Sequence, residues 1–329
     1  MKKYIAILLV AAMATLGISA CRKENSNKET KVQKDDIKVV TTIFPEYDWV
    51  RQIAGEEADQ MDITMLLDNG VDLHSYQPTA EDIMKVSDCD LFVYVGGESD
   101  AWVDDALKQA KNKDMQVVNL LDVLGNNAKE EEVIEGMEPE EEKEGGEEEE
   151  PEYDEHVWLS VKNAEVLSKA IADALEKADP DHKDIYQENA SAYSEKLKDL
   201  DAKYQEVVDG ASQKTLLFGD RFPFRYLVDD YGLSYYAAFV GCSAESEASF
   251  DTISFLANKV DELGLKDIMA IENSNQKIAK TIIENTKEKN QKILTLDTMQ
   301  STTSDDVKNG TTYLSVMEKN LEVLKEALQ

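Results

Sequence analysis

Two of the three histidines in this 329-residue chain stand in loops that follow predicted β-strands. His74 lies in DLHSYQPT, after the apolar run DITMLL, and His156 lies in EHVWLS, after a long acidic stretch. In open parallel sheets, ligands bind beyond the carboxyl ends of the strands, where loops and helix amino ends gather. Neutral imidazole nitrogens at such an edge can coordinate a divalent metal ion. A single loop histidine is more often a surface residue, so the hypothesis depends on further donors.

Three carboxylates end predicted strands in the second half of the chain. Asp220 follows KTLLFG, Glu272 follows DIMAI and Asp297 ends KILTLD. Imidazole nitrogen together with carboxylate oxygen suits borderline ions such as zinc and manganese. The pattern predicts a metal site to which the first half of the chain gives nitrogen donors and the second half gives oxygen donors.

Short apolar runs alternate with amphipathic segments on either side of the acidic stretch. This alternation is typical of βα units in parallel sheets. Thr79, followed by Asp82, and Ser249 are predicted helix caps. The expected fold is α/β, with two lobes that each hold a roughly four-stranded parallel sheet flanked by helices. The predicted strands are 37–43, 62–67, 90–96, 116–121, 214–219, 233–241, 267–272 and 292–297.

One long helix is predicted between the lobes, over residues 179–210. Its apolar residues recur at helical spacing from Tyr186 to Val207, and Asp179 and Pro180 suit its first turn. The helix divides the chain into an N-terminal lobe, 37–178, and a C-terminal lobe, 211–329. A rigid connection of this kind predicts little hinge bending, so a bound metal should order loops of the cleft and shift one lobe only modestly.

The first residues predict export and lipidation. Two lysines precede an apolar run that ends in small residues, which indicates a signal peptide over 1–20. Ile18-Ser19-Ala20-Cys21 resembles a bacterial lipobox, so Cys21 is the expected lipidation site and 21–36 a flexible tether. The expected location is therefore extracytoplasmic, with the chain anchored to the bacterial cell membrane by lipid.

The charge of the chain restricts its partners. The formal net charge is −33, which argues against nucleic acid and against electrostatic docking on anionic lipid. Residues 129–154 form an acidic insert that is predicted to be disordered, because such a block repels itself and cannot bury a core. A weak cation collector beside His156 is the alternative reading. Cys89 and Cys242 are expected to stay unpaired.

The chain resembles the metal-binding receptors of bacterial ABC importers, the zinc and manganese substrate-binding lipoproteins. The resemblance runs from about Ile37 to the end. It is carried by DLHSYQPT, EHVWLSVKNA, RYLVDDYGL, the glutamate of IEN and LD before Thr298. It implies two lobes joined by a long helix, with one metal ion in the cleft held by His74, His156 and Asp297. Zinc is favoured over manganese because the acidic insert is typical of zinc receptors.

One position departs from the family pattern. The family normally has His or Glu five residues before the tyrosine of the YL pair, and here that residue is Arg221. Arginine stays protonated and has no lone pair to give. A shift by one residue offers Asp220 as the preferred substitute, with Glu245, Glu247 and Cys242 as rivals. Arg221 is then expected to pair with Glu272 or with a ligating carboxylate and to hold it in place.

The chain is not expected to be an enzyme. It contains no HExxH, GxSxG or P-loop motif. A zinc-dependent hydrolase is the alternative if water fills an open coordination position, and a surface adhesin or scaffold without metal is another. The expected partners are a divalent metal ion and the membrane subunits of an ABC importer, and the receptor is expected to be monomeric.

Overall fold

The computed structural model describes residues 36–138, 152–243 and 247–329. The predicted signal peptide, Cys21, almost all of the tether, the centre of the acidic insert and Glu245 lie outside these residues. Among the residues described, none of the helices combines the length and the apolar character needed to cross a bilayer.

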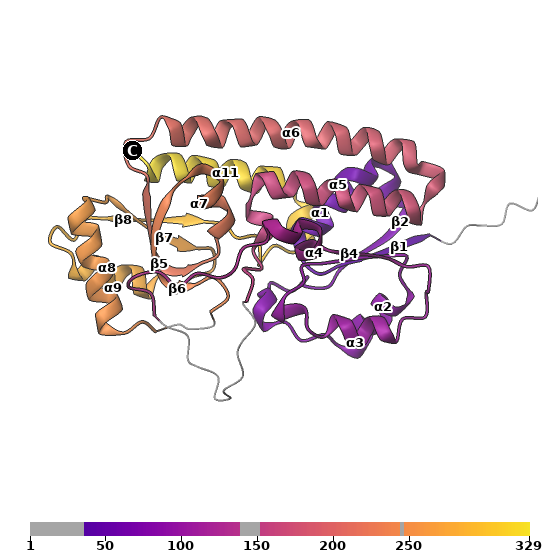
Figure 1. Ribbon diagram of the computed structural model, residues 1–329, viewed down its shortest axis with the longest axis horizontal. Coiled ribbons are helices and arrows are strands. Elements are labelled where there is room, and N and C mark those ends of the chain that lie inside the picture. The colour runs from indigo at the N-terminus through magenta and orange to yellow at the C-terminus, as the bar shows by residue number, and fades with distance from the viewer. Residues whose placement is uncertain (1–35, 139–151, 244–246) are drawn as a thin grey trace, which may run out of the picture. The chain divides into compact units, whose positions relative to one another are not determined.

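The first lobe contains a four-stranded sheet in the order β2-β1-β3-β4 (Figure 1). All neighbouring strands are parallel, which places the carboxyl end of every strand at one edge. The strand β3 is buried along its whole length, as expected when helices cover both faces of a parallel sheet. The strands are β1 (Ile37–Thr41), β2 (Met61–Met65), β3 (Leu91–Tyr94) and β4 (Gln116–Asn119).

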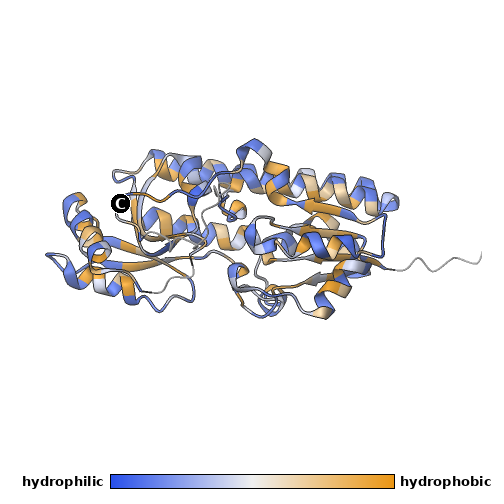
Figure 2. Cartoon of the chain, turned by 60° about the horizontal axis from the view of Figure 1, so that its bottom comes forward, coloured by the Kyte–Doolittle hydropathy of each residue, from blue (hydrophilic) through white to orange (hydrophobic). Residues whose placement is uncertain are grey.

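The second lobe repeats this arrangement with a parallel sheet in the order β6-β5-β7-β8. Its strands are β5 (Thr215–Phe222), β6 (Ser234–Val240), β7 (Asp267–Ile271) and β8 (Lys292–Leu296). Figure 2 shows that the strands of both sheets are mainly hydrophobic, whereas the helices alternate in hydropathy. The predicted fold class and all eight predicted strands are confirmed.

Helices begin where the capping residues predict. The Thr79 side chain accepts the backbone N–H of Asp82, and the Asp82 side chain accepts the backbone N–H of Thr79. The Ser249 side chain accepts the backbone N–H of Thr252. The first lobe has α1 (Phe44–Ala54), α2 (Ala80–Asp88), α3 (Val103–Lys108), α4 (Leu120–Leu124) and α5 (Val161–Ala178). The second has α7 (Arg225–Tyr231), α8 (Phe250–Leu263), α9 (Lys277–Asn285), α10 (Ser304–Lys308) and α11 (Tyr313–Ala327).

The long helix α6 (Lys183–Asp209) has 27 residues and runs beside helices of both lobes (Figure 1). It packs against α1 and α5 of the first lobe and against α7 and α11 of the second. The Tyr204 hydroxyl donates to the Met317 carbonyl in α11 at 2.7 Å. The helix starts later than predicted, because residues 180–182 form a separate 3₁₀ turn. Asp179 does not cap α6 but accepts the Tyr186 hydroxyl at 2.7 Å.

Contacts outside α6 also join the lobes. The buried Asp48 of α1 accepts the backbone N–H of Tyr313 at the start of α11, at 2.9 Å. The Tyr313 ring packs edge-on against Trp49, with centroids 5.2 Å apart, and its hydroxyl donates to the Trp158 carbonyl at 2.7 Å. One hydrophobic core includes residues of both sheets and of α6. These contacts brace the lobes and oppose hinge bending.

The two ends of the acidic insert are ordered, which differs from the predicted disorder over 129–154. The N–H of Asp154 donates to the Lys129 carbonyl at 2.8 Å, and Glu130 and Tyr153 form an isolated antiparallel β-bridge. Glu138 donates its N–H to the Ala238 carbonyl in β6, and its carboxylate accepts from Thr252 at 2.7 Å. The prediction from charge composition was wrong for these two ends because they gain backbone hydrogen bonds and pack against the second lobe. The rest of the insert, residues 139–151, lies outside the described residues.

Candidate metal centre

His74 lies in a short 3₁₀ turn, Leu73–Ser75, in the loop after β2. Asp72 fixes this turn by accepting the backbone N–H of His74 at 3.0 Å. The imidazole is mostly buried, with 9% of the side chain exposed. Its Nδ1 lies 2.9 Å from the Ser99 hydroxyl and 3.3 Å from Oε2 of Glu155. These partners leave Nε2 facing the second histidine.

His156 is fully buried at the entry to the turn Val157–Leu159. Asp154 accepts the backbone N–H of His156 at 2.8 Å and lies 3.0 Å from its Nδ1. The Asp154 carbonyl in turn accepts the Tyr226 hydroxyl of α7 at 2.9 Å, so the second lobe holds this turn in place. Burial lowers the pKa of His156, although Asp154 opposes that effect, so the neutral ring is favoured.

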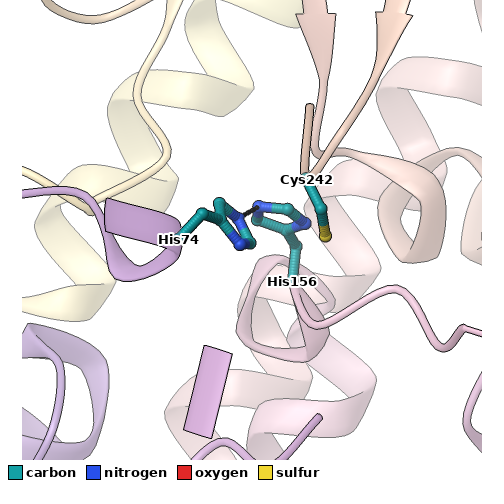
Figure 3. Close-up of side chains that lie close together, drawn as sticks. All are labelled: His74, His156 and Cys242. Carbon is teal, nitrogen blue, oxygen red and sulfur yellow. Dashed lines mark hydrogen bonds between the residues drawn. The ribbon is translucent and has the colours of Figure 1, made fainter. Parts of the chain in front are cut away.

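The two Nε2 atoms face one another at 3.1 Å, as Figure 3 shows. A carboxylate beside each Nδ1 favours the tautomer with hydrogen on Nδ1 and a lone pair on Nε2. Two imidazoles bound to a tetrahedral zinc ion at about 2.0–2.1 Å would hold their nitrogens about 3.3 Å apart. The observed spacing therefore fits a shared cation with only a small adjustment.

Glu155 belongs to this arrangement as well. Its Oε1 accepts the Ser99 N–H at 2.9 Å, whereas the buried Oε2 has no hydrogen-bond partner and lies nearest to Nδ1 of His74. Burial raises the pKa of Glu155, but His74 and Ser99 outweigh it and hold the pKa below its usual range. A carboxylate thus lies beside Nδ1 of each imidazole.

Cys242 is the third donor that the fold brings to this point. It follows β6 in a turn, and one donor atom from each of His74, His156 and Cys242 lies within 4.8 Å of the other two. No other such group of three or more potential ligands occurs in the part of the chain that the structure describes. A Cβ on the preceding Gly241 would come within 3.0 Å of the His156 ring and 2.9 Å of the Phe222 carbonyl, so glycine permits this close approach. The sequence analysis placed Cys242 only as a rival to Asp220 for the third ligand.

Asp220, the preferred substitute ligand, does not join this group. β5 extends to Phe222, so Asp220 and Arg221 lie within a strand, where the pairing with β6 shifts its register between Phe218 and Arg221. The Asp220 carboxylate accepts the N–H of Arg221 at 3.0 Å and that of Ile271 in β7 at 3.5 Å. The predicted role of Asp220 as a ligand is therefore not supported by this geometry.

Arg221 binds a carboxylate of the other lobe. Its guanidinium pairs with Asp72, the residue that caps the His74 turn. Burial raises the pKa of Asp72, but Arg221 outweighs this and lowers the pKa below its usual range. The prediction named Glu272 or a ligating carboxylate as the partner of Arg221; the ion pair found in the described residues is the one with Asp72. Arg221 thus connects β5 to the loop that carries His74.

Glu272 and Asp297 are used within the second lobe. Glu272 accepts the backbone N–H of Thr298 at 2.7 Å and its hydroxyl at 2.5 Å. Asp297 accepts the N–H of Met299 at 2.8 Å. Burial raises the pKa of both carboxyls. The loop they shape reaches the first lobe through Gln300, which accepts the Leu73 N–H at 3.3 Å. Asp297 itself lies outside the three-residue group.

Comparison with known proteins agrees with this architecture. A family model described as "Zinc-uptake complex component A periplasmic" matches residues 39–327. The chain belongs to this family. Members of the zinc-uptake family are transport components and not enzymes, which agrees with the sequence prediction.

Two curated relatives in the zinc-uptake family are similar over nearly the whole chain. The chain is 34% identical over 322 residues to the zinc-binding lipoprotein AdcA of Streptococcus pneumoniae, covering 97% of this chain but 60% of that protein. It is 31% identical over 329 residues to the high-affinity zinc uptake system protein ZnuA of Bacillus subtilis, covering 99% and 98%.

A solved structure of a zinc-uptake relative has the same fold. The Zn(II)-bound ZnuA-like domain of S. pneumoniae AdcA superposes with a TM-score of 0.68 at 31% identity. The superposition covers 89% of this chain and 99% of that domain. The predicted resemblance to zinc receptors is thus confirmed at the level of family and fold.

Sequence reasoning missed the carboxylates that support the two histidines of this chain. Asp72 and Asp154 each precede a histidine by two residues, in Asp-Leu-His and Asp-Glu-His. Each accepts the backbone N–H of its histidine, as aspartate does in Asx turns. The repeated D-x-H spacing was a signal for these two residues. Glu155 directly follows the predicted acidic insert, so its role could not be separated from the charge run.

Proposed function

We propose that this chain is an extracytoplasmic receptor that binds zinc between its two lobes and delivers it to the membrane subunits of an ABC importer. The observation that carries this proposal is the pair of imidazole Nε2 atoms 3.1 Å apart, each with its Nδ1 beside a carboxylate. Membership of the zinc-uptake family supports it. The receptor acts as a monomer anchored by lipid on Cys21.

The histidines His74 and His156 are the nitrogen ligands of the proposal. Asp297 is the proposed oxygen ligand, and it requires a small shift of its loop toward the histidines. That loop already contacts the His74 loop, because Gln300 accepts the Leu73 N–H at 3.3 Å. A water molecule completes the tetrahedral set if Asp297 stays in place.

Zinc is proposed over manganese because of the donor set. Manganese suits carboxylate, carbonyl and water oxygens, whereas imidazole suits zinc. The carboxylates Asp220 and Glu272 accept backbone N–H groups of their own lobe, so these two oxygen donors are already engaged. The S. pneumoniae relative of known structure is Zn(II)-bound, which supports the same choice.

Metal binding in this receptor acts on loops more than on whole lobes. The His74 loop is tied to the second lobe at several points. Asp68 accepts the Ser304 hydroxyl at 2.7 Å, Asp72 pairs with Arg221, and Leu73 donates to Gln300. The buried contacts of Tyr313 brace the lobes further. Zinc replaces the direct contact between the histidines and orders these loops, and the importer senses that local change.

The test is metal content and affinity of the purified protein. Native extraction followed by elemental analysis should give one zinc ion per chain, and titration against a chromophoric chelator should show tighter binding of zinc than of manganese. A protein that retains no ion would contradict the proposal and favour an adhesin or scaffold, whereas turnover of a hydrolytic substrate would favour the enzyme alternative.

Delivery is tested separately in cells. Uptake of labelled zinc should fall when the gene is deleted and recover when it is restored. Small-angle scattering with and without zinc checks the mechanical part of the proposal. A large compaction of the protein on zinc addition would contradict a loop-based response.

A further inference from the structure

The turn after β6 brings a thiol to the two histidines. One donor atom each of His74, His156 and Cys242 lies within 4.8 Å of the other two, and the Cys242 side chain stands beside the His156 ring in Figure 3. The histidines come from the first lobe and the cysteine from the second. The second lobe thus reaches this point with sulfur, although its strand-end carboxylates were expected to supply oxygen.

The position of Cys242 is fixed on both sides. Its backbone N–H donates to the Glu131 carboxylate at 3.2 Å, so an ordered end of the acidic insert holds the turn. The preceding Gly241 leaves no room for a side chain, since a Cβ there would lie 2.9 Å from the Phe222 carbonyl and 3.0 Å from the His156 ring. Small residues in this turn let the chain approach the imidazole closely.

Arg221 stands at the position where the family has a His or Glu ligand. Its guanidinium pairs with Asp72 and has no lone pair to give to a metal. A cysteine in this pocket can therefore replace the oxygen donor that Arg221 cannot supply.

We propose that Cys242 binds zinc as a thiolate, so that one sulfur joins the two imidazole nitrogens as a protein ligand, and that this sulfur selects thiophilic ions against manganese. The thiol proton is released to solvent as the zinc–sulfur bond forms. Sulfur favours zinc and cadmium, whereas manganese prefers oxygen. This inference rests on the proposed function and names the residue that sets its metal specificity.

Cobalt substitution tests the sulfur ligand directly. Cobalt(II) bound to a thiolate absorbs in the near ultraviolet by charge transfer from sulfur, and nitrogen and oxygen ligands do not give that band. The protein should be prepared as Cys21→Ser, so that Cys89 is the only other thiol in a chain with three cysteines. We expect the band in this protein and in its Cys89→Ser variant, which is a matched control because Cys89 is buried and donates to the Val86 carbonyl. Cys242→Ser should lose the band.

The outcomes separate this inference from the proposed function. A protein that binds one cobalt or zinc ion without the charge-transfer band overturns the role of Cys242 and leaves the receptor function standing. A protein that binds neither ion overturns the receptor function itself. Absence of the band from the protein with Cys242 intact is decisive alone, whereas a band is assigned to Cys242 by its persistence in the Cys89→Ser variant.

Metal competition tests the selectivity. Cys242→Ser should lower the affinity for zinc and for cadmium at least tenfold and leave the affinity for manganese nearly unchanged. The ratio of the zinc affinity to the manganese affinity should therefore fall by about the same factor. Thermal unfolding of both proteins checks that the substitution leaves the fold intact. An equal loss of affinity for all three ions would contradict a selective role of the sulfur.

Discussion

The two lobes use their polar side chains differently at the carboxyl ends of their strands. In the first lobe, Asp72 and Asp154 hold the backbone of the two histidines, and both Nε2 atoms remain directed at one point. In the second lobe, Asp220 and Glu272 accept backbone N–H groups of neighbouring strands and loops. One set of carboxylates positions ligands, whereas the other shapes loops.

This difference shows that residue type and place in the fold do not suffice to identify a ligand. Asp220 and His74 both lie near the carboxyl edge of a sheet, and both types of side chain can bind zinc. What separates them is whether the donor atom is already hydrogen-bonded to the protein. A carboxylate that satisfies buried N–H groups would leave those groups unpaired if it moved to a metal, at a cost of about 1–3 kcal/mol for each.

The largest effect should come from the histidines of the first lobe. His156→Ala and His74→Ala should each weaken zinc binding by at least 100-fold, because each removes one of the proposed ligands. Calorimetric titration measures the affinity. His182→Ala is the matched control, since His182 lies near Asp179 and Glu57 at the start of the long helix. Equal losses in all three variants would contradict the assignment.

Glu155 should matter next, through the orientation of His74. Glu155→Gln replaces the acceptor that faces Nδ1 with an amide, and we expect zinc affinity to fall by about tenfold, in the range for residues that support a metal ligand. Nitrogen NMR of labelled histidine reports the tautomer directly, and the chain has only three histidines to assign. An unchanged His74 tautomer in the variant would show that Glu155 does not orient the ring, and restored affinity in Glu155→Asp would support it.

Asp297 tests whether a second-lobe carboxylate changes its role on metal binding. If its loop shifts toward the histidines as proposed, Asp297→Asn should weaken zinc binding by about fivefold to tenfold. The affinity comes from competition with a chelator of known strength. A variant that binds zinc as tightly as the parent protein would leave the fourth position to water.

The pair of Arg221 and Asp72 should contribute a smaller effect. Arg221→Gln removes a partly buried ion pair between the lobes, and we expect zinc affinity to fall about threefold because the His74 turn loses an anchor. A double-mutant cycle with Asp72→Asn should show a coupling of about 0.5–1 kcal/mol. The matched control is Arg225→Gln, whose ion pairs with Glu132 and Asp229 do not reach the His74 turn. Additive effects of the two substitutions would contradict a direct interaction.

The smallest effect on zinc should come from Asp220. Asp220→Asn should leave zinc affinity within about twofold of the parent value, because the carboxylate accepts backbone N–H groups and does not face the histidines. Urea denaturation should show a loss of about 1 kcal/mol, typical of one weakened hydrogen bond. A tenfold loss of zinc affinity with unchanged stability would restore Asp220 as a ligand.

Much of the fold could be predicted because its signals are local. All eight strands, the caps at Thr79 and Ser249 and the long helix follow from apolar periodicity and from capping residues, which depend only on near neighbours in the chain. The sequence also singled out His74 and His156, because each stands in a loop beyond a strand or the acidic insert, and their role as metal ligands stays a prediction. The acidic composition led to a wrong prediction of disorder at the two ends of the insert, which pack on the second lobe.

The sequence alone determined the two lobes, their connection and the pair of imidazoles. The tertiary structure decided which side chains join that pair. Asp220 accepts the backbone N–H of Ile271, 51 residues away, and Arg221 pairs with Asp72, 149 residues away. Cys242 lies beside the two histidines of the other lobe. The physical reason is that a donor atom is available to a metal only if no distant backbone or charged group already satisfies it, and the spacing of residues along a chain carries no record of such long-range partners.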